Sequence, residues 1–340
     1  MNTHIFNPNN TFNAFWIERF QSFLQGEKFS RVVSNISRNL LIPITALAIF
    51  LGIWSAVAAQ IETSLGALPG PVKVWGQTVQ LYQEHRASRD KESAFYERQE
   101  KRNAERVKHD PGYEPRIRPY TGAPTFFDQI ITSLLTVATG FLLAAIIAIP
   151  IGIICGMSTI LYQALNPLIQ IFKPVSPLAW LPLVTIVVSA VYISDDPLFD
   201  KAFITSAITV TLCCLWPTII NTTVGVSSVD KDLLNVSRVL RLDWFTRTLK
   251  IILPSATPMI FTGLRLSLGI GWMVLIAAEM LAQNPGLGKF VWDEFQNGSS
   301  ESLARIMVAV LVIGLIGFLL DRGMLLLQKY FSWDRNAVVR

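Results

Sequence analysis

Long apolar runs alternate with polar segments over most of this 340-residue chain. Six runs of about 20 residues or more hold few charged side chains. They cover 40–59, 129–157, 174–193, 202–229, 258–282 and 306–327. A helix of about 20 apolar residues crosses the roughly 30 Å hydrocarbon core of a bilayer. The pattern therefore predicts an all-α integral membrane protein with six transmembrane helices.

The composition supports a membrane protein and excludes several other classes. The chain is 51% hydrophobic with a mean hydropathy of +0.42, which is too apolar for a soluble domain of this size. Its net charge is +5, but the basic residues are scattered among acidic ones, so we expect no nucleic-acid partner. Cys155, Cys213 and Cys214 fall inside apolar runs and are expected to be packing residues rather than disulfide partners or metal ligands.

The two ends of the chain predict its orientation. Lys28, Arg31 and Arg38 precede the first apolar run and place the N-terminus in the cytoplasm, because Lys and Arg are enriched in cytoplasmic segments. Six crossings then leave the tail, 328–340, in the cytoplasm too. The N-terminal segment, 1–39, carries aromatic residues at helical intervals: Phe12, Phe15, Trp16, Phe20 and Phe23. They predict a helix in the lipid headgroup region or, equally, one that packs on the first membrane helix.

A charged insertion, 60–125, separates the first two apolar runs on the outer side of the membrane. Its first part, up to Tyr82, is expected to lie along the membrane surface. Its central part, 84–119, holds ten Lys or Arg and eight Asp or Glu, with opposite charges four residues apart. This spacing predicts a solvated helix that ends near His109, before Pro111 and Gly112. The insertion is either a periplasmic platform for a binding protein or a solvated segment with no partner.

The third apolar run contains three prolines, Pro174, Pro177 and Pro182. Proline removes a backbone hydrogen bond, so this helix is predicted to be broken or kinked. A bilayer tolerates such a break only where neighbouring helices or water satisfy the freed backbone groups, as in a substrate pathway. Residues 158–166, just before it, are expected to form a short turn.

The polar loop 229–258 is predicted to face the cytoplasm, because short loops rich in Lys and Arg stay inside. Leu233, Val236 and Leu240 are spaced so that a short helix would place them on one face, with Arg238 and Arg241 elsewhere. A helix with such a face can dock on a partner.

Few ionisable residues lie in the apolar runs or directly at their ends: Lys173, Arg265, Glu279, Asp321 and Arg322. Such charges usually face the interior of a helix bundle or a water-filled cavity. The Arg265 guanidinium could hold an anion by paired hydrogen bonds. Alternatively, Arg265 anchors at the cytoplasmic headgroups or pairs with a neighbouring carbonyl.

No enzyme site is evident in the sequence. The glycines near Lys289 lack the spacing of a phosphate-binding loop, and the three histidines, His4, His85 and His109, are far apart. General acid–base or metal chemistry needs groups that this chain does not gather. We therefore expect a non-catalytic subunit with no bound cofactor, whose energy comes from another subunit.

The loop 229–258 resembles the signature loop of type I ABC-transporter permeases. The family pattern is Glu-Ala-Ala, three residues, Gly, nine residues, Ile, one residue, Leu-Pro. The same frame here gives Asn235-Val236-Ser237, then Arg241, then Ile251, Leu253 and Pro254. The spacing and the hydrophobic end are kept, whereas the acidic start and the glycine are replaced.

Further stretches resemble the branch of these permeases that serves nitrate, bicarbonate, sulfonates and taurine. They are LPGP at 68–71, KPVSPLAWLP at 173–182, FTGLRLS at 261–267, AEM at 278–280 and NPGLG at 284–288. Within that branch, the charged insertion, NPLIQIFKP at 166–174 and WDEFQNG at 292–298 look most like nitrate permeases, with bicarbonate permeases next.

The resemblance implies the transmembrane domain of a type I ABC importer at 40–327, in a bacterial inner membrane. Two permease chains, expected to be identical, would form the pathway, and a periplasmic or lipid-anchored binding protein would deliver the anion. Partner ATPases would bind ATP and Mg²⁺ and drive alternating access through a coupling helix in the loop. Membrane lipid is the remaining partner.

The residues expected to contact the ATPase are Asp232, Leu233, Asn235, Val236, Ser237, Leu240, Arg241 and Leu242. The candidate residues of the pathway are Lys173, Pro177, Trp180, Arg265 and Glu279. A stand-alone channel or secondary transporter is the alternative from another class. It would need inverted repeats and a cluster of ionisable groups near the membrane midplane, and neither is evident.

Overall fold

The computed structural model describes residues 27–63, 66–110, 112–193, 199–299 and 301–331. The chain divides into two compact units, 1–72 and 73–340. The predicted N-terminal helix with its aromatic residues at 12–23 lies outside the described residues, as does most of the tail.

The first unit contains one long helix and a short hairpin. Helix α2, Glu27–Ala58, includes a stretch at 41–58 that is long and apolar enough to cross a membrane. The first predicted span is thereby confirmed, although the helix continues without a break across the expected boundary at residue 39. Strands β1, Glu62–Thr63, and β2, Gly66–Ala67, pair antiparallel, with Glu62 opposite Ala67.

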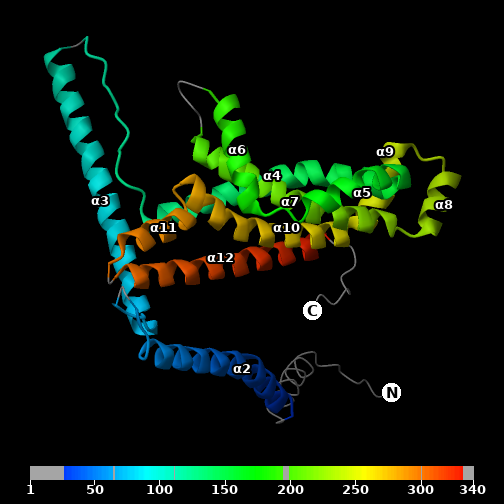
Figure 1. Ribbon diagram of the computed structural model, residues 1–340, viewed down its shortest axis with the longest axis horizontal. Helices are drawn as coiled ribbons and strands as arrows, with labels where there is room; N and C mark the ends of the chain where they lie inside the picture. The colour runs from blue at the N-terminus through cyan, green and yellow to red at the C-terminus, as the bar shows by residue number, and fades with distance from the viewer. Residues whose placement is uncertain (1–26, 64–65, 111, 194–198, 300, 332–340) are drawn as a thin grey trace, which may run out of the picture. The chain divides into compact units, whose positions relative to one another are not determined.

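The charged insertion forms an arm of one helix and a returning segment. Helix α3 spans Pro71–His109, and its end at His109 is as predicted. Pro71 starts this helix, which runs on through the charged residues although Gly76 lies inside it. That the part up to Tyr82 lies along the membrane surface stays a prediction. The return segment, 112–125, runs back beside α3 (Figure 1). Gln99 fixes it by exchanging two hydrogen bonds with the backbone of Arg118, at 3.0 and 3.4 Å.

Ionic and polar contacts attach the arm to the helix bundle. Arg89 pairs with Asp128 at 2.8 Å, at the start of helix α4, Phe126–Met157. Arg305 pairs with Glu84 of the arm and with Glu294, the latter at 3.2 Å. Arg305 belongs to helix α12, Ser302–Phe331, and Glu294 to helix α11, Leu287–Asn297. The arm is therefore tied directly to α4 and α12, and Arg305 also links α12 to α11.

Helices α4, α7 (Lys201–Ser227) and α10 (Leu253–Ala282) form the packed centre of the second unit. Small residues let their backbones approach closely. A Cβ at Gly140 would lie 2.6 Å from the carbonyl oxygen of Ala207, and one at Gly271 would lie 2.6 Å from the sulfur of Cys214. The thiols of Cys155 and Cys214 are free and buried, in agreement with a packing role.

The third predicted span is broken into two helices. Helix α5, Thr159–Phe172, and helix α6, Pro177–Val191, meet at a bend of 100°. The predicted break is confirmed. The predicted turn at 158–166 is wrong, because Ser158 alone reverses the chain and its side chain caps α5 by accepting from the Leu161 amide. The described residues contain five helices able to cross a membrane, or six if α5 and α6 count as one broken span.

The loop 229–258 contains more helix than expected. Helix α8, Lys231–Val239, is followed by α9, Trp244–Arg247, and by a π-helical turn, Thr248–Ile252, that leads into α10. Asp243 starts α9 by accepting hydrogen bonds from the amides of Phe245 and Thr246, both at 3.1 Å. Helix therefore resumes at Trp244, inside the range 229–258 that was predicted as the loop.

Candidate functional site

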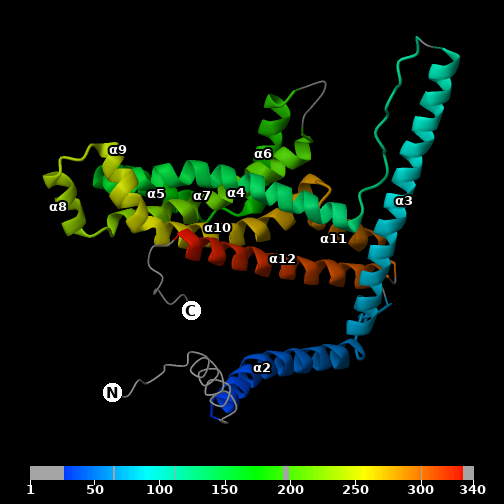
Figure 2. The same ribbon diagram turned by 180° about the vertical axis from the view of Figure 1, so that it is seen from behind.

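Helices α8 and α9 lie at one end of the second unit, and α3 lies at the other (Figures 1 and 2). Asp230 starts α8 by accepting a hydrogen bond from the Asp232 amide at 2.9 Å. A carboxylate at this position also interacts favourably with the helix dipole. The short helix is therefore well defined although it has only nine residues.

The end of α8 has the geometry of a Schellman cap. The amide of Leu242 donates to the carbonyl of Ser237, and the amide of Arg241 donates to that of Arg238, both at 3.0 Å. Arg241 itself adopts a left-handed conformation, with φ of +49°. Glycine is the usual residue at this place in the cap because it has no Cβ. Arg241 occupies the position of the glycine in the signature pattern, and it adopts a conformation that glycine favours.

The two faces of α8 have different surroundings. Leu234 packs against a buried cluster, Val226, Val229, Ile252, Ala256 and Ile260, and Ser237 is buried. On the outer side, Leu233, Val236 and Leu240 are 45, 53 and 63% exposed. The remaining expected contacts, Asp232, Asn235 and Arg241, are also exposed, whereas Leu242 is half-buried. Their contact with an ATPase stays a prediction.

The exposed apolar surface at this end is larger than the sequence indicated. Val239 of α8 and Trp244 and Phe245 of α9 are also exposed. We call the six residues Leu233, Val236, Val239, Leu240, Trp244 and Phe245 the end patch. The adjacent aromatic pair in a polar loop was the signal that could have extended the prediction. Hydrogen bonds from Thr246, and then from Phe245, lower the pKa of the Asp243 carboxyl beside this patch, so it stays ionised there at neutral pH.

Three of the candidate pathway residues lie together at the bend between α5 and α6. Lys173 caps the end of α5, and Pro177 is the first residue of α6. The ring of Trp180 lies 5.8 Å from that of Phe172, which in turn stacks on Trp216 of α7 at 6.0 Å. The aromatic contacts hold the broken span against α7.

Arg265 is paired with a carboxylate. Its guanidinium makes two hydrogen bonds to Asp321 of α12, one of them 2.9 Å between Nη2 and Oδ2. From the sequence, the expected partner of Arg265 was a bound anion, a lipid headgroup or a neighbouring carbonyl, and the structure supplies a carboxylate. The pair links α10 to α12, and its place in a pathway stays a prediction.

Glu279 is fully buried and engaged in hydrogen bonds. Its carboxylate accepts from the amide of Gly288 at 3.0 Å and from the hydroxyl of Ser133 at 2.8 Å. The Ser133 oxygen also accepts from the Leu287 amide at 2.9 Å. These bonds join α4, α10 and the start of α11. In the described chain Glu279 has no exposure to water, so its role in a pathway also stays a prediction.

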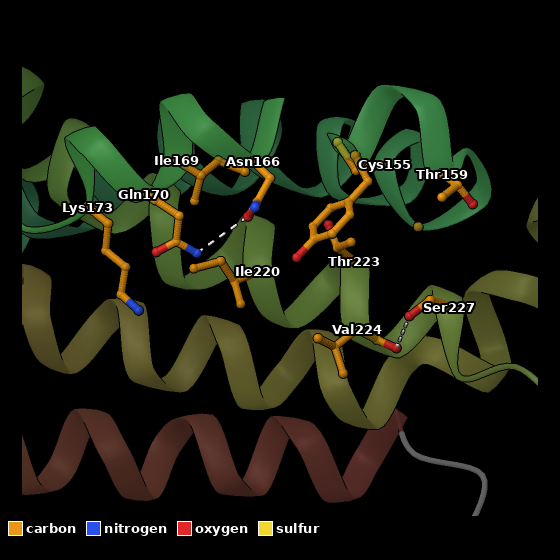
Figure 3. Close-up of a pocket in the computed structure, with 12 residues that line it drawn as sticks. Cys155, Thr159, Asn166, Ile169, Gln170, Lys173, Ile220, Thr223, Val224 and Ser227 are labelled. Atoms are coloured by element: carbon orange, nitrogen blue, oxygen red, sulfur yellow. Dashed lines mark hydrogen bonds between the residues drawn. The ribbon is translucent and has the colours of Figure 1, made fainter. Parts of the chain in front are cut away.

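A cavity of about 330 Å³ lies between α5, α7 and the end of α4 (Figure 3). We call it the α5–α7 cavity. Its lining comprises Cys155, Gly156, Thr159, Tyr162, Asn166, Ile169, Gln170, Lys173, Ile220, Thr223, Val224 and Ser227. Hydroxyl groups, side-chain amides and one ammonium group therefore line the same cavity between the helices. No group of three or more His, Cys, Asp or Glu among the residues described here is placed to hold a metal ion.

Comparisons with known proteins point to one family. The nitrate import permease protein NrtB of Leptolyngbya laminosa is 41% identical over 205 residues, which are 59% of this chain and 68% of that protein. The bicarbonate transport system permease protein CmpB of Synechococcus elongatus is 33% identical over 294 residues, 86% of this chain and 89% of that protein.

The fold is also found in a solved transporter. The inward facing MetNI methionine ABC transporter aligns with a TM-score of 0.53 at 12% identity, over 61% of this chain and 96% of that chain. The family described as binding-protein-dependent transport system inner membrane component matches residues 148–332, more than half of the 340. This chain, with its spanning helices and its signature loop folded as α8, belongs to that family of ABC-type permease subunits.

Proposed function

We propose that this chain is the permease of an ATP-driven importer that carries nitrate or a similar small oxyanion across the inner membrane. The observation that carries the proposal is the exposed end patch of α8 and α9, in the loop whose spacing matches the signature of the family. An apolar surface of this kind on a short amphipathic helix is typical of a docking site for another protein. The partner would be the ATPase subunit, which binds ATP and Mg²⁺.

The proposal includes an orientation. The end patch would face the cytoplasm, with its basic neighbours Arg238, Arg241 and Arg247, in keeping with the enrichment of Lys and Arg on that side. The arm, at the opposite end of the second unit, would then reach into the periplasm (Figure 2). Both termini would be cytoplasmic. A substrate-binding protein would deliver the anion on the outer side, and a second copy of this chain would complete the pathway.

Nitrate is the first substrate to test, because relatives named as nitrate permeases are similar over much of their length. Bicarbonate is a second candidate, supported by the similarity to CmpB over 86% of this chain. The permease, its ATPase and its binding protein would be assembled in proteoliposomes, and uptake of labelled nitrate would be measured with bicarbonate and taurine as competitors.

We expect nitrate uptake that requires both ATP and the binding protein. Uptake by the permease alone would instead support a channel or secondary transporter. Uptake of bicarbonate but not nitrate by the full assembly would keep the permease role and change the substrate.

A further inference from the structure

Helix α5 carries a polar stripe along one side. Thr159, Tyr162, Asn166, Gln170 and Lys173 follow one another at intervals of three or four residues, so they lie on one face of the helix. Outside the stripe most residues of α5 are apolar, with Ile160, Leu168 and Ile171 among the exposed ones, and Gln163 is the polar exception. A polar face on a helix in a bilayer is costly unless it meets a partner, water or a substrate.

The whole stripe lines the α5–α7 cavity. Across the cavity, α7 contributes a second set of residues at helical spacing, Ile220, Thr223, Val224 and Ser227. Figure 3 shows the Asn166 and Gln170 side chains joined by a hydrogen bond, 3.4 Å long, on the side of α5 that faces the cavity. The polar residues of the stripe therefore line an open cavity and are not covered by a neighbouring helix.

The charge of the lining selects the kind of ligand. Lys173 is the one charged residue among the lining residues, which include no carboxylate. Lys173 makes no ion pair within the part of the chain that the structure describes, whereas Arg265 is held by Asp321. An ammonium group with amide and hydroxyl donors around it attracts a small anion with several oxygen acceptors.

We propose that the α5–α7 cavity is a binding site for a small oxyanion on its way through the permease. Lys173 supplies the charge, and Gln170, Asn166 and Tyr162 supply hydrogen-bond donors. The proposal rests on the proposed function, since it places the transported anion at a defined point of this chain. Lys173 directly follows α5, at the bend toward α6, so it forms that end of the stripe.

The test uses the assembled permease, ATPase and binding protein in proteoliposomes, with labelled nitrate. Loss of one charge-assisted interaction typically corresponds to about a tenfold or larger effect. We expect Lys173→Met to lower the ATP-dependent uptake rate at least about tenfold, and Lys173→Arg to recover most of it because the positive charge returns. Lys201→Met, at the far end of α7 and outside the cavity, is the matched control and should transport at the wild-type rate.

The outcomes separate this proposal from the proposed function. If the wild-type assembly takes up no oxyanion, the proposed function fails. If it takes up nitrate and Lys173→Met does so at the same rate, the cavity is not the anion site. Should Lys173→Met fail to assemble with the ATPase, Gln170→Leu decides instead: a severalfold loss of uptake supports the site, and an unchanged rate overturns it.

Discussion

The hydroxyl of Ser133 on α4 lies 2.8 and 2.9 Å from the two carboxylate oxygens of Glu279 on α10, and none of these groups reaches solvent. The same carboxylate accepts from the Gly288 amide at the start of α11. A Cβ at Gly286 would collide with a carboxylate oxygen of Glu279, so a larger residue there would displace the carboxylate. Three helices therefore depend on one buried acidic side chain.

Removing the Glu279 side chain should weaken the contact between α4, α10 and α11. We expect Glu279→Ala to lower the free energy of unfolding by about 3 kcal/mol, because the partners of a buried charge lose their hydrogen bonds together. Ser133→Ala should cost less, about 1–2 kcal/mol, since the Gly288 amide still bonds the carboxylate. The measurement is the thermal unfolding of the purified chain in detergent.

Thr139→Ala is the matched control for Ser133→Ala. Thr139 also lies on α4, but its hydroxyl bonds only the carbonyl of Leu135 in its own helix. Equal melting temperatures for Ser133→Ala and Thr139→Ala would show that the bond to Glu279 contributes nothing.

The left-handed conformation of Arg241 predicts that glycine at this position stabilises the cap of α8 and that a β-branched residue destabilises it. A residue with a Cβ costs on the order of 1 kcal/mol in this conformation, and a β-branched residue costs more. We expect Arg241→Gly to slow hydrogen exchange of the Leu242 amide, which closes the cap, and Arg241→Val to speed it several-fold. Faster exchange in Arg241→Gly than in the wild type would mean that the arginine side chain stabilises the cap in another way.

The pair between Arg265 and Asp321 predicts a modest coupling. The two side chains are 34 and 39% exposed, so water or lipid headgroups screen part of the attraction. In a double-mutant cycle with Arg265→Met and Asp321→Asn, we expect a coupling energy of about 1 kcal/mol in thermal unfolding. Lys289→Met with Asp293→Asn, an ion pair between neighbouring turns of α11, is the comparison and should couple by less. A coupling near zero for the first pair would contradict its role in joining α10 to α12.

The long helices were predictable because each is a long apolar run between polar segments. The ends of helices α4, α7 and α12 lie within a few residues of the ends of the predicted ranges. The end of α3 at His109 was also predictable, since Pro111 and Gly112 follow it. Helix α5 could not be predicted, because its mixture of polar and apolar residues fits a turn as well as a helix. The Ser158 side chain, which caps the helix, favours the helix.

The pairings of the charged residues could not be predicted. Ser133 is separated from Glu279 by 146 residues, and Arg265 from Asp321 by 56. The sequence identifies such residues as expensive in a membrane, but their partners depend on which helix faces meet. The outer face of α8 could be predicted, because a period of three to four residues over Leu233, Val236 and Leu240 is a local property.

That outer face predicts how coupling to an ATPase would be lost. A charge at Val236, near the centre of the end patch, would have to be buried without a partner if an ATPase docked there, and this costs several kcal/mol. We expect Val236→Asp to insert in the membrane in normal amounts, to retain little ATPase on purification, and to lower nitrate uptake by about tenfold or more. Lys231→Ser, an exposed substitution at the start of the same helix, is the control for disturbance of α8 itself. Full transport in Val236→Asp would mean that the end patch does not contact the ATPase, because a buried, unpaired carboxylate could not leave such a contact intact.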